Sequence, residues 1–387
     1  MKKRVIIIGI NNGNTLGLVR SLGKCGYPVV VFLEPCDKYF CALRFSKYLT
    51  RIHYLDKLET ALDLLRGEYA QEESKTVMLT GSDRAAVLLD RYYDELSEHY
   101  VFFNAGMRGR VTYFLDKFNT FPLAETAGIR LIKTWRVCGG EKLPDDLVFP
   151  CLVKGNNSTT SSKSHMAVCR DRTQLIRVMK KGIDYLVQEF LEKEYELDIV
   201  GLSCRHGRDV LLPGAVYKVR EFLDRQSLFV RLDDVASYPD LPIDAVKRLV
   251  LAIGYEGMFS VELIFSKGVY YFLEINLRND AMAYIYTKGG VNYPDLWARV
   301  ATGEDPGKLF AGIHLRTPLY MMQEADLYAM FAGRVNFFRW IRDFCRTQVF
   351  PVLDFVDIKP FAYTMFVHIL QVRKRLLRLC GFNIKLR

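Results

Sequence analysis

Residues 259–278 contain two strongly strand-like segments on either side of a Ser-Lys-Gly turn, and each segment carries a carboxylate among bulky apolar side chains. Alternate side chains of a strand share one face, so Glu274, Asn276 and, if the strand continues, Arg278 are expected to point the same way. A three-residue hairpin loop places Glu262 on that face too, opposite Glu274 or one step away. The pattern predicts an antiparallel hairpin with two carboxylates, an amide oxygen and a guanidinium on one face.

The four polar side chains of this hairpin are of kinds that bind ions. Two carboxylates and an amide oxygen suit Mg²⁺ or Mn²⁺, and Arg278 adds a cation beside a bound phosphate or carboxylate. The alternative is an exposed outer face, on which alternating glutamate and apolar residues are ordinary. Glu262 alone fits that alternative, but its combination with Asn276 and Arg278 favours an ion-binding face.

The N-terminal part of the sequence starts with an apolar, β-branched run at residues 4–10, followed by a loop of small residues at 11–15. A helix-like stretch at 16–25 and a second apolar run at 29–33 complete a strand–loop–helix–strand unit. Such a unit is a parallel βαβ motif. Residues 1–110 are therefore expected to form a small doubly wound α/β domain.

The composition is that of an ordinary globular protein, with 50% hydrophobic and 25% charged residues in a total of 387. The nine cysteines form no CxxC pair and the six histidines are dispersed, which favours reduced thiols over a thiol- or histidine-based metal site. No apolar stretch reaches the roughly 18 residues of a membrane helix, and no secretory leader is recognised. We therefore expect a cytoplasmic protein.

The net charge of +10 is concentrated near the end of the sequence, where seven basic residues and no acidic residue follow Asp357. Because the excess is local, we do not expect the body to bind nucleic acid. Residues 365–379 form either an amphipathic helix on an anionic membrane surface or a helix packed on the body with solvated arginines. The first alternative places the protein at the inner face of the membrane and suits a lipid-linked glycan substrate.

Two further segments suit a nucleotide. Lys154 closes a short strand and precedes a loop rich in Asn, Ser and Thr at residues 155–163, which offers hydroxyls and backbone N–H groups to phosphate oxygens. At residues 187–198 an apolar strand breaks into an acidic link and resumes. Backbone groups of such a link can bond an adenine edge, and an acidic side chain can hold ribose hydroxyls. Alternatively, Lys154 is an exposed lysine before a flexible loop, and the acidic link is merely solvated.

In this order, the segments resemble the ATP-grasp superfamily, in particular carboxylate–amine ligases with an ATP-binding domain like that of carbamoyl phosphate synthase. The matching strings are Asp116-Lys117, Phe149-Pro150-Cys151-Leu152-Val153-Lys154, Gln188-Glu189-Phe190-Leu191, Glu262 and Glu274-Ile275-Asn276-Leu277-Arg278. The resemblance covers roughly residues 1–305. One departure is the loop after Lys154, which is usually glycine-rich in the family and here contains only Gly155.

The resemblance implies a Rossmann-like pre-ATP-grasp domain at residues 1–110, an ATP-grasp domain at 111–305 and a helical, basic C-terminal extension at 306–387. The ATP-grasp domain would comprise a small subdomain at about 130–190 and a metal-binding subdomain at about 191–305. The expected fold class is therefore α/β followed by α+β, with a two-subdomain ATP-grasp fold.

The resemblance also implies a reaction, in which ATP phosphorylates a carboxylate and an amine then attacks the acylphosphate. The positions that would bind ATP are Lys117, Lys154, Ser158, Gln188, Glu189, Phe190, Leu191 and Glu194. Those that would ligate Mg²⁺ or Mn²⁺ are Glu262, Glu274 and Asn276, and those that would act in catalysis are Lys154 and Arg278. The ribose ligand stays open between Glu194 and Glu196.

The implied function is an ATP- and Mg²⁺-dependent ligase for small-molecule or glycan-linked carboxylate and amine substrates, in surface-polysaccharide or other small-molecule biosynthesis. Neither the two substrates nor an oligomeric state is identified by the sequence. One alternative is a non-catalytic nucleotide-binding protein on the same fold. Another is a nicotinamide-dependent oxidoreductase, which the loop at residues 9–17 disfavours because it lacks the GxGxxG spacing.

Overall fold

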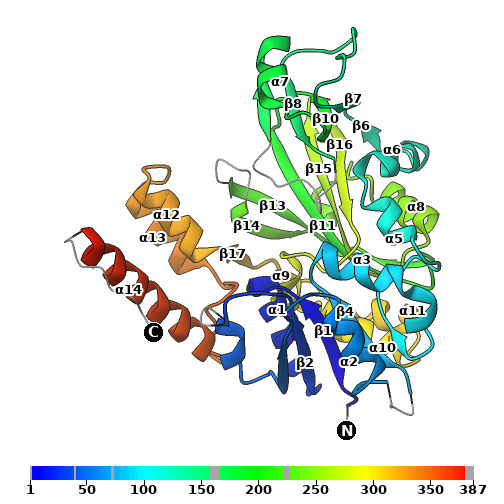
Figure 1. The fold of residues 1–387 in the computed structure, drawn as a ribbon, viewed down its shortest axis with the longest axis vertical. Helices are drawn as coiled ribbons and strands as arrows, with labels where there is room; N and C mark the ends of the chain where they lie inside the picture. Colours follow the sequence, from blue (N-terminus) through cyan, green and yellow to red (C-terminus); the bar gives the residue numbers. More distant parts are fainter. Residues whose placement is uncertain (1, 39–40, 71–73, 157–165, 222–226, 380–387) are drawn as a thin grey trace.

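The computed structural model describes residues 2–38, 41–70, 74–156, 166–221 and 227–379, with the backbone alone for 372–379. Three β-sheets follow one another along the chain, and a group of C-terminal helices extends to one side of them (Figure 1). No helix of these ranges is long and apolar enough to cross a membrane. The eight cysteines that lie in them form no disulfide, as expected.

The first sheet has five parallel strands in the order β3-β2-β1-β4-β5. Its elements are β1 (Val5–Gly9), α1 (Gly13–Gly23), β2 (Val29–Leu33), η2 (Ala42–Phe45), β3 (Arg51–Tyr54), α2 (Thr60–Arg66), β4 (Thr76–Thr80), α3 (Asp83–Arg91), α4 (Tyr93–Leu96) and β5 (Tyr100–Val101). Along β1, Val5 and Ile7 belong to one hydrophobic cluster and Ile6 and Ile8 to another, so both faces of the sheet are covered. The predicted doubly wound α/β arrangement is confirmed.

The second sheet is antiparallel, in the order β7-β10-β8-β9. The elements of this part are α5 (Arg110–Phe114), α6 (Lys117–Thr126), β6 (Arg130–Leu131), β7 (Thr134–Cys138), β8 (Cys151–Gly155), β9 (Ala167–Cys169), α7 (Arg172–Val178) and β10 (Asp184–Glu189). Helix α6 begins at Lys117 because Asp116 caps it, accepting a hydrogen bond from Phe118 N at 3.0 Å. The cap therefore fixes the backbone position of Lys117 at the first turn of the helix.

The third sheet has eight strands, in the order β17-β14-β13-β11-β15-β16-β6 with β12 paired to β11. Its elements up to residue 276 are β11 (Tyr195–Cys204), β12 (Asp209–Leu211), β13 (Gly214–Glu221), β14 (Ser227–Asp234), η4 (Val235–Ser237), α8 (Ile243–Ile253), β15 (Gly257–Ser266) and β16 (Val269–Asn276). The predicted β15–β16 hairpin is confirmed. Its loop has two residues instead of three, because Ser266 pairs with Val269 and both Lys267 and Gly268 take positive φ, at 50° and 76°.

The C-terminal part is mainly helical but also completes the third sheet. Its elements are α9 (Ala283–Lys288), α10 (Tyr293–Ala301), α11 (Pro306–Ala311), β17 (Leu319–Met321), α12 (Gln323–Phe331), α13 (Phe337–Arg346) and α14 (Lys359–Leu379). Strand β17 pairs antiparallel with β14 at the edge of the sheet. The sequence did not predict this strand, because three residues are too few to show an alternation.

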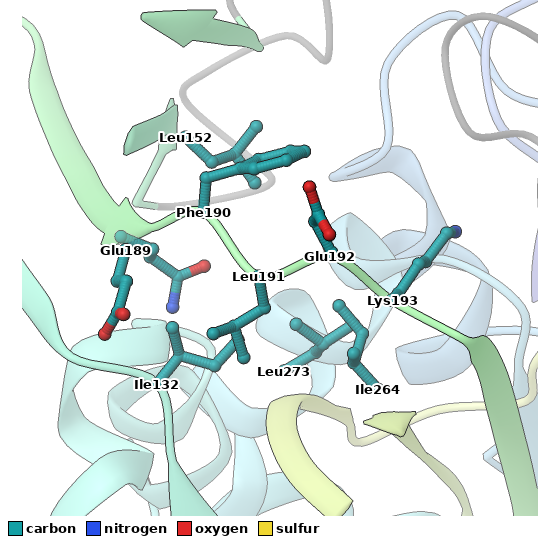
Figure 2. Close-up of a pocket in the computed structure, with 10 residues that line it drawn as sticks. Ile132, Leu152, Glu189, Phe190, Leu191, Glu192, Lys193, Ile264 and Leu273 are labelled. Atoms are coloured by element: carbon teal, nitrogen blue, oxygen red, sulfur yellow. The ribbon is translucent and has the colours of Figure 1, made fainter. Parts of the chain in front are cut away.

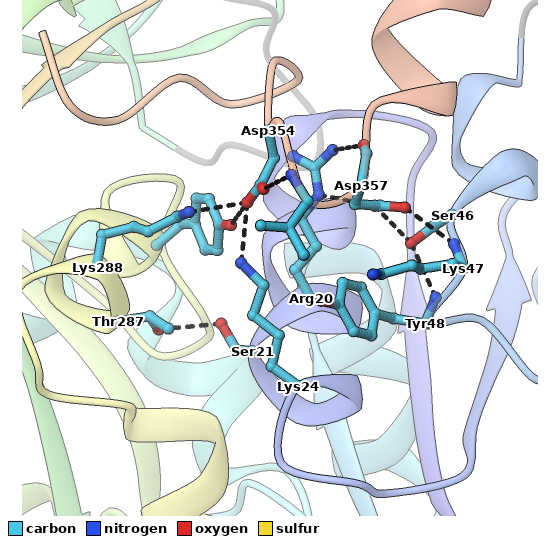
Figure 3. A network of polar contacts seen from close by, with 12 residues as sticks. Arg20, Ser21, Lys24, Ser46, Lys47, Tyr48, Thr287, Lys288, Asp354 and Asp357 are labelled. Atoms are coloured by element: carbon cyan, nitrogen blue, oxygen red, sulfur yellow. Dashed lines mark hydrogen bonds and ion pairs between the residues drawn. The ribbon is translucent and has the colours of Figure 1, made fainter.

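A buried ion pair attaches the segment between α13 and α14 to helix α1 (Figure 3). Arg20 Nε donates to Asp357 Oδ2 at 2.9 Å, and Arg20 Nη2 donates to the carbonyl oxygen of Val352 at 2.8 Å. Asp357 also accepts hydrogen bonds from Ser46 Oγ at 2.8 Å and Lys47 N at 2.9 Å. Both charged groups are therefore buried with several hydrogen bonds each, which is the condition for tolerating such a pair.

A second aspartate of this segment, Asp354, is also buried. It accepts hydrogen bonds from Lys24 at 2.9 Å, Lys288 at 2.8 Å and Tyr284 Oη at 2.9 Å. Burial works to raise the pKa of Asp354, but its bonds to the two lysines and the tyrosine hold this pKa well below its ordinary value. Burial and the nearby Lys288 lower the pKa of Lys24. The surroundings therefore stabilise the negative charge of Asp354 and not the positive charge of Lys24.

Candidate nucleotide and substrate site

A row of three carboxylates crosses adjacent strands of the third sheet. Glu262 on β15 lies opposite Glu274 on β16, as the hairpin pattern predicts. On its other side, Glu262 lies opposite Asp198 of β11. Directly opposed residues on neighbouring strands point to the same face, so these carboxylates share one face of the sheet. We call Asp198, Glu262 and Glu274 the carboxylate row.

Lys117 meets this row from outside the sheet. It is the first residue of α6, and its ammonium group pairs with the Glu274 carboxylate. Burial works to lower the pKa of Lys117, but Glu274, with a smaller contribution from Glu262, raises it above its ordinary value. The structure thus brings a candidate phosphate ligand into contact with a candidate metal ligand.

Arg278 follows the end of β16 and stays close to its side chains. Its Nη2 donates to Asn276 Oδ1 at 3.3 Å, and its Nε donates to Asp83 Oδ1, at the start of α3, at 2.6 Å. Asn276 Nδ2 in turn donates to Ser260 Oγ at 3.3 Å. Burial works to lower the pKa of Arg278, but Asp83 and Asp280 raise it. The guanidinium is therefore held charged and in a fixed position next to Asn276.

Lys218 on β13 is a buried cation that the sequence analysis did not single out. Its ammonium group donates to Glu196 and lies 3.4 Å from Glu262 Oε2. Burial raises the pKa of Glu262 against the opposing effect of Lys218, whereas Lys218 and Lys193 outweigh burial at Glu196 and lower its pKa. Glu196 and Glu262 are therefore both counter-ions of Lys218, and Glu196 is the closer of the two. A lysine among the apolar residues of the first part of β13 is the only sequence signal, and it does not reveal the partners.

The oxygen donors of this region fit a magnesium ion that is carried by ATP. Within the described ranges, no three histidine, cysteine, aspartate or glutamate side chains form a compact metal-binding group. Mg²⁺ at nucleotide sites takes one or two carboxylates and completes its octahedron with phosphate oxygens and water. Glu262, Glu274 and Asn276 supply oxygens of that kind. Asp198 Oδ1, on the neighbouring strand β11, is buried without a hydrogen-bond partner among the described residues.

A cavity of about 310 Å³ lies between the second and third sheets (Figure 2). The residues that line it are Ile132, Leu152, Gln188, Glu189, Phe190, Leu191, Glu192, Lys193, Ile264 and Leu273. The acidic link after β10 thus forms one wall, and apolar side chains of β8, β15 and β16 form the opposite ones. We call this space the hinge cavity. An apolar slot with a polar edge suits a flat heteroaromatic ring.

Some polar groups at the start of the acidic link have a hydrogen-bond partner and others do not. Phe190 N donates to the carbonyl oxygen of Pro150 at 3.1 Å. Gln188 Nε2 donates to Thr134 Oγ1 at 2.9 Å, whereas the buried Gln188 Oε1 has no partner among the described residues. A buried acceptor without a donor costs free energy unless a ligand or water supplies one.

Lys154 and Ser158 were the phosphate candidates of the loop after β8. Lys154 lies two residues after Leu152, so both side chains are on the face of β8 that borders the hinge cavity. Ser158 lies outside the described residues, as does the following loop to residue 165.

The two ribose candidates differ in environment. Glu194 is exposed, and its Oε1 accepts a hydrogen bond from Lys267 N at 2.8 Å. Glu196 is buried and already neutralises Lys218. Glu192, which the sequence did not single out, lines the hinge cavity itself.

A second cavity, of about 630 Å³, adjoins the carboxylate row and extends to the C-terminal helices. The lining residues include Asn11, Asn12, Asn14, Asp198, Lys218, Glu262, Asp280, Tyr320, Met322, Gln323, Glu324, Pro351, Val352 and Thr364. Glu262 borders this cavity, and Ile264, on the same face of β15, borders the hinge cavity. Glu262 therefore lies where β15 passes from one cavity to the other, and Asp198 beside it also lines the second cavity. We call the second one the substrate cavity.

Comparison with known sequences finds partial relatives only. No protein-family model matches the chain. The carbamoyl phosphate synthase large chain of Clostridium botulinum (strain Langeland) is 26% identical over 196 residues, which cover 46% of this chain and 17% of that protein. The large chain of Clostridium beijerinckii is 28% identical over 218 residues, which cover 51% of this chain and 19% of that protein. The matched segments thus span less than a fifth of these relatives.

Solved structures match most of the chain. An L-amino acid ligase from Bacillus licheniformis has a TM-score of 0.66 at 17% identity, covering 82% of this chain and 79% of that chain. The N5-carboxyaminoimidazole synthetase of Staphylococcus aureus, complexed with ADP, has a TM-score of 0.61 at 15% identity, covering 79% of each chain. The biotin carboxylase domain of the Hydrogenobacter thermophilus 2-oxoglutarate carboxylase has a TM-score of 0.65 at 15% identity, covering 82% of this chain and 73% of that chain. This chain therefore has the ATP-grasp fold, the fold of the superfamily that its motifs resemble.

Proposed function

We propose that the protein is an ATP- and Mg²⁺-dependent ligase that phosphorylates a carboxylate and couples the acylphosphate to an amine. The observation that carries this proposal is the position of Glu262 where β15 passes between two cavities, with Glu274 opposite it and Lys117 paired to Glu274. One cavity suits a purine and the other a polar substrate, so their reacting groups would meet at the carboxylate row. An L-amino acid ligase and an ADP-bound synthetase among the structural neighbours support the proposal.

In this proposal the hinge cavity holds the adenine ring. Leu152 and Ile264 would pack against the ring, and the link at residues 188–191 would meet its polar edge, with Gln188 Oε1 as an acceptor that still needs a donor. Lys117 and Lys154 would bind the phosphate oxygens as point charges.

For the ribose we propose Glu194. Its exposed carboxylate is bonded to one backbone N–H and can exchange that partner for a ribose hydroxyl at little cost. Glu196 is the poorer choice, because it is buried and moving it would leave Lys218, whose side chain is only 9% exposed, without its closest counter-ion.

Glu262, Glu274 and Asn276 would hold Mg²⁺, which when bound supplies charge neutralisation for the transferring phosphoryl group. Arg278, fixed by Asp83, would neutralise the acylphosphate or hold the acid. Phosphoryl transfer forms the bond between the carboxylate oxygen and phosphorus and releases ADP. The amine nitrogen then attacks the acyl carbon, the carbon–oxygen bond to phosphate breaks, phosphate leaves with the electron pair, and the amine loses a proton.

A screen of carboxylate and amine pairs for ADP and phosphate release tests this proposal. We expect release that requires Mg²⁺ and one acid, and that increases when the matching amine is added. Binding of MgADP without release for any pair would support a non-catalytic nucleotide-binding protein instead. Binding of a nicotinamide cofactor in place of ADP would support an oxidoreductase.

We also propose that the C-terminal extension contacts an anionic membrane surface. Eleven of the eighteen exposed large hydrophobic side chains in the described ranges lie beyond residue 327. On α14, Phe366 and Ile369 are 55% and 62% exposed, and four basic residues follow on the same helix. Exposed apolar side chains next to basic ones are typical of helices that lie in a membrane interface. This contact would bring the protein to lipid-linked glycan substrates.

Vesicle co-sedimentation tests the membrane contact. The intact protein should sediment with phosphatidylserine vesicles and much less with phosphatidylcholine vesicles, and the double variant Phe366→Glu with Ile369→Glu should lose this binding. Ile176→Glu, at a position that is 62% exposed on α7, is the matched control and should bind like the wild type. Equal sedimentation of all three proteins would show that α14 does not contact the membrane.

A further inference from the structure

Carboxyl groups outnumber basic groups among the described residues that line the substrate cavity. Asp198, Glu262, Asp280 and Glu324 line it, and Lys218 is the one basic residue among its described lining residues. Lys218 is itself ion-paired with Glu196 and Glu262 and so does not offset the remaining carboxyl groups. An acidic cavity of this kind favours a cationic ligand over an anionic one.

Two side chains of this cavity have buried polar atoms without partners. Asp198 is 4% exposed, and its Oδ1 has no hydrogen-bond partner among the described residues. Gln323 is 8% exposed, and neither its Nε2 nor its Oε1 has a partner there. Buried polar groups are almost always hydrogen-bonded. A ligand that forms hydrogen bonds with these atoms would therefore gain the most binding free energy. They need a donor at Asp198 and both a donor and an acceptor at Gln323.

The position of Gln323 is fixed by its surroundings. It is the first residue of α12, and only Met322 separates it from the edge strand β17. Three residues further along the helix, Asp326 is fully buried and accepts two hydrogen bonds from Arg220, at 2.6 Å and 2.7 Å. A bidentate arginine contact of this kind holds the start of α12 against β13. Gln323 therefore faces the substrate cavity as part of a rigid wall.

We propose that the substrate cavity binds the amine substrate, with its amino group at Asp198 and a neighbouring carboxamide or hydroxyl group at Gln323. This inference rests on the proposed function, because it specifies the acceptor of the same reaction. An ammonium or amine N–H supplies the donor that Asp198 Oδ1 lacks, and a carboxamide satisfies both atoms of Gln323 at once. Gln323 lies in the C-terminal part, beyond the residues that carry the ATP-grasp motifs.

Thermal shift in the presence of saturating MgADP tests the proposal. The probes are glycinamide, alaninamide and glucosamine, each compared with its N-acetyl derivative, and propylamine as an amine without a second polar group. We expect at least one of the three polar amines to raise the unfolding midpoint, its N-acetyl derivative to have no effect, and propylamine to act more weakly.

Two variants separate the two contacts. Asp198→Asn should lose the shift with every amine while keeping the shift caused by MgADP alone. Gln323→Leu should weaken binding of the polar amine by about fivefold or more, to the level of propylamine, and leave propylamine unchanged. Asp244→Asn removes an exposed carboxylate on α8 and should behave like the wild type.

Three results would overturn the inference. The first is an equal shift by the amines and their N-acetyl derivatives, or no shift by any. The second is a Gln323→Leu protein that still prefers the polar amine over propylamine. The third is loss of the MgADP shift itself in Asp198→Asn, which would assign Asp198 to the nucleotide site. Absence of a MgADP shift in the wild type would instead contradict the proposed function.

Discussion

The contact between Lys117 and Glu274 joins two roles that the motifs assign separately, phosphate binding and metal binding. Without nucleotide, each group neutralises the other. A nucleotide with its metal ion would bring the opposite charge to each of them, so the ion pair can separate without leaving an unpaired charge in a partly buried site. Each residue should therefore be required for catalysis.

Replacing Glu274 with Gln tests this at the residue scale. The change removes the charge of one candidate metal ligand and keeps the size of the side chain. We expect ADP release to fall by about 10²-fold or more, the cost typical of losing one electrostatic contact at a reacting centre. Steady-state kinetics with the best acid and amine pair measures the effect.

Glu125→Gln, an exposed position on α6, provides the matched control and should keep full activity. Unchanged turnover in Glu274→Gln would show that Glu274 is not a metal ligand.

The buried Asp354 predicts how the free energy of unfolding depends on pH. Because its pKa is lower in the folded protein than in the unfolded chain, its charge contributes stability above the unfolded pKa of about 3.9 and loses that contribution as the pH falls further. Asp354→Asn should therefore lower the free energy of unfolding by about 2 kcal/mol at pH 7. The difference in the free energy of unfolding between Asp354→Asn and the wild type should stay constant down to about pH 5 and shrink below about pH 4. Urea unfolding at several pH values measures it, and a difference independent of pH would contradict the assigned cause.

At the scale of elements, contacts with helix α1 hold the segment between α13 and α14 in position. Gly13 at the start of α1 lies so close to Pro351 that an added Cβ would come within 2.7 Å of its Cβ. Arg20, about two helical turns further on, binds the Asp357 carboxylate and three carbonyl oxygens of the same segment. These contacts hold one wall of the substrate cavity in place.

Arg20→Met should lower the free energy of unfolding by about 3–5 kcal/mol, because it leaves the Asp357 carboxylate buried without its cation. Chemical denaturation measures the loss. Arg91→Met, an exposed position at the end of α3, is the control and should stay within about 0.5 kcal/mol of the wild type. Equal effects of the two substitutions would show that the buried ion pair is not a structural anchor.

The β15–β16 hairpin could be predicted from sequence because its strands are adjacent in the chain, so alternation and turn residues fix which side chains face each other. That local rule placed Glu262 opposite Glu274. The positions of Asp198 and Lys218 in the site could not be predicted, because the pairing of their strands is not local. Their strands, β11 and β13, join the same sheet through pairings between distant segments, and no local pattern determines that register.

At the scale of the whole molecule, the proposed division at residues 110 and 305 follows the three sheets only in part. Strand β6 belongs to the third sheet although the second sheet follows it in sequence, and β17 adds an edge strand from beyond residue 305. The substrate cavity is enclosed by the loop after β1, the third sheet and the C-terminal segments. The segments that we propose for nucleotide binding are thus recognisable from sequence, whereas the wall of the proposed substrate cavity depends on tertiary contacts that no sequence motif indicates.

The most direct test of carboxylate activation is trapping of the acylphosphate with hydroxylamine, which converts it into a coloured hydroxamate without requiring the natural amine. The protein is incubated with ATP, Mg²⁺ and a panel of carboxylic acids. We expect hydroxamate with at least one acid, dependent on ATP and Mg²⁺ and lost in Glu274→Gln. A protein that binds MgADP but forms no hydroxamate with any acid of the panel would contradict the proposed ligase reaction.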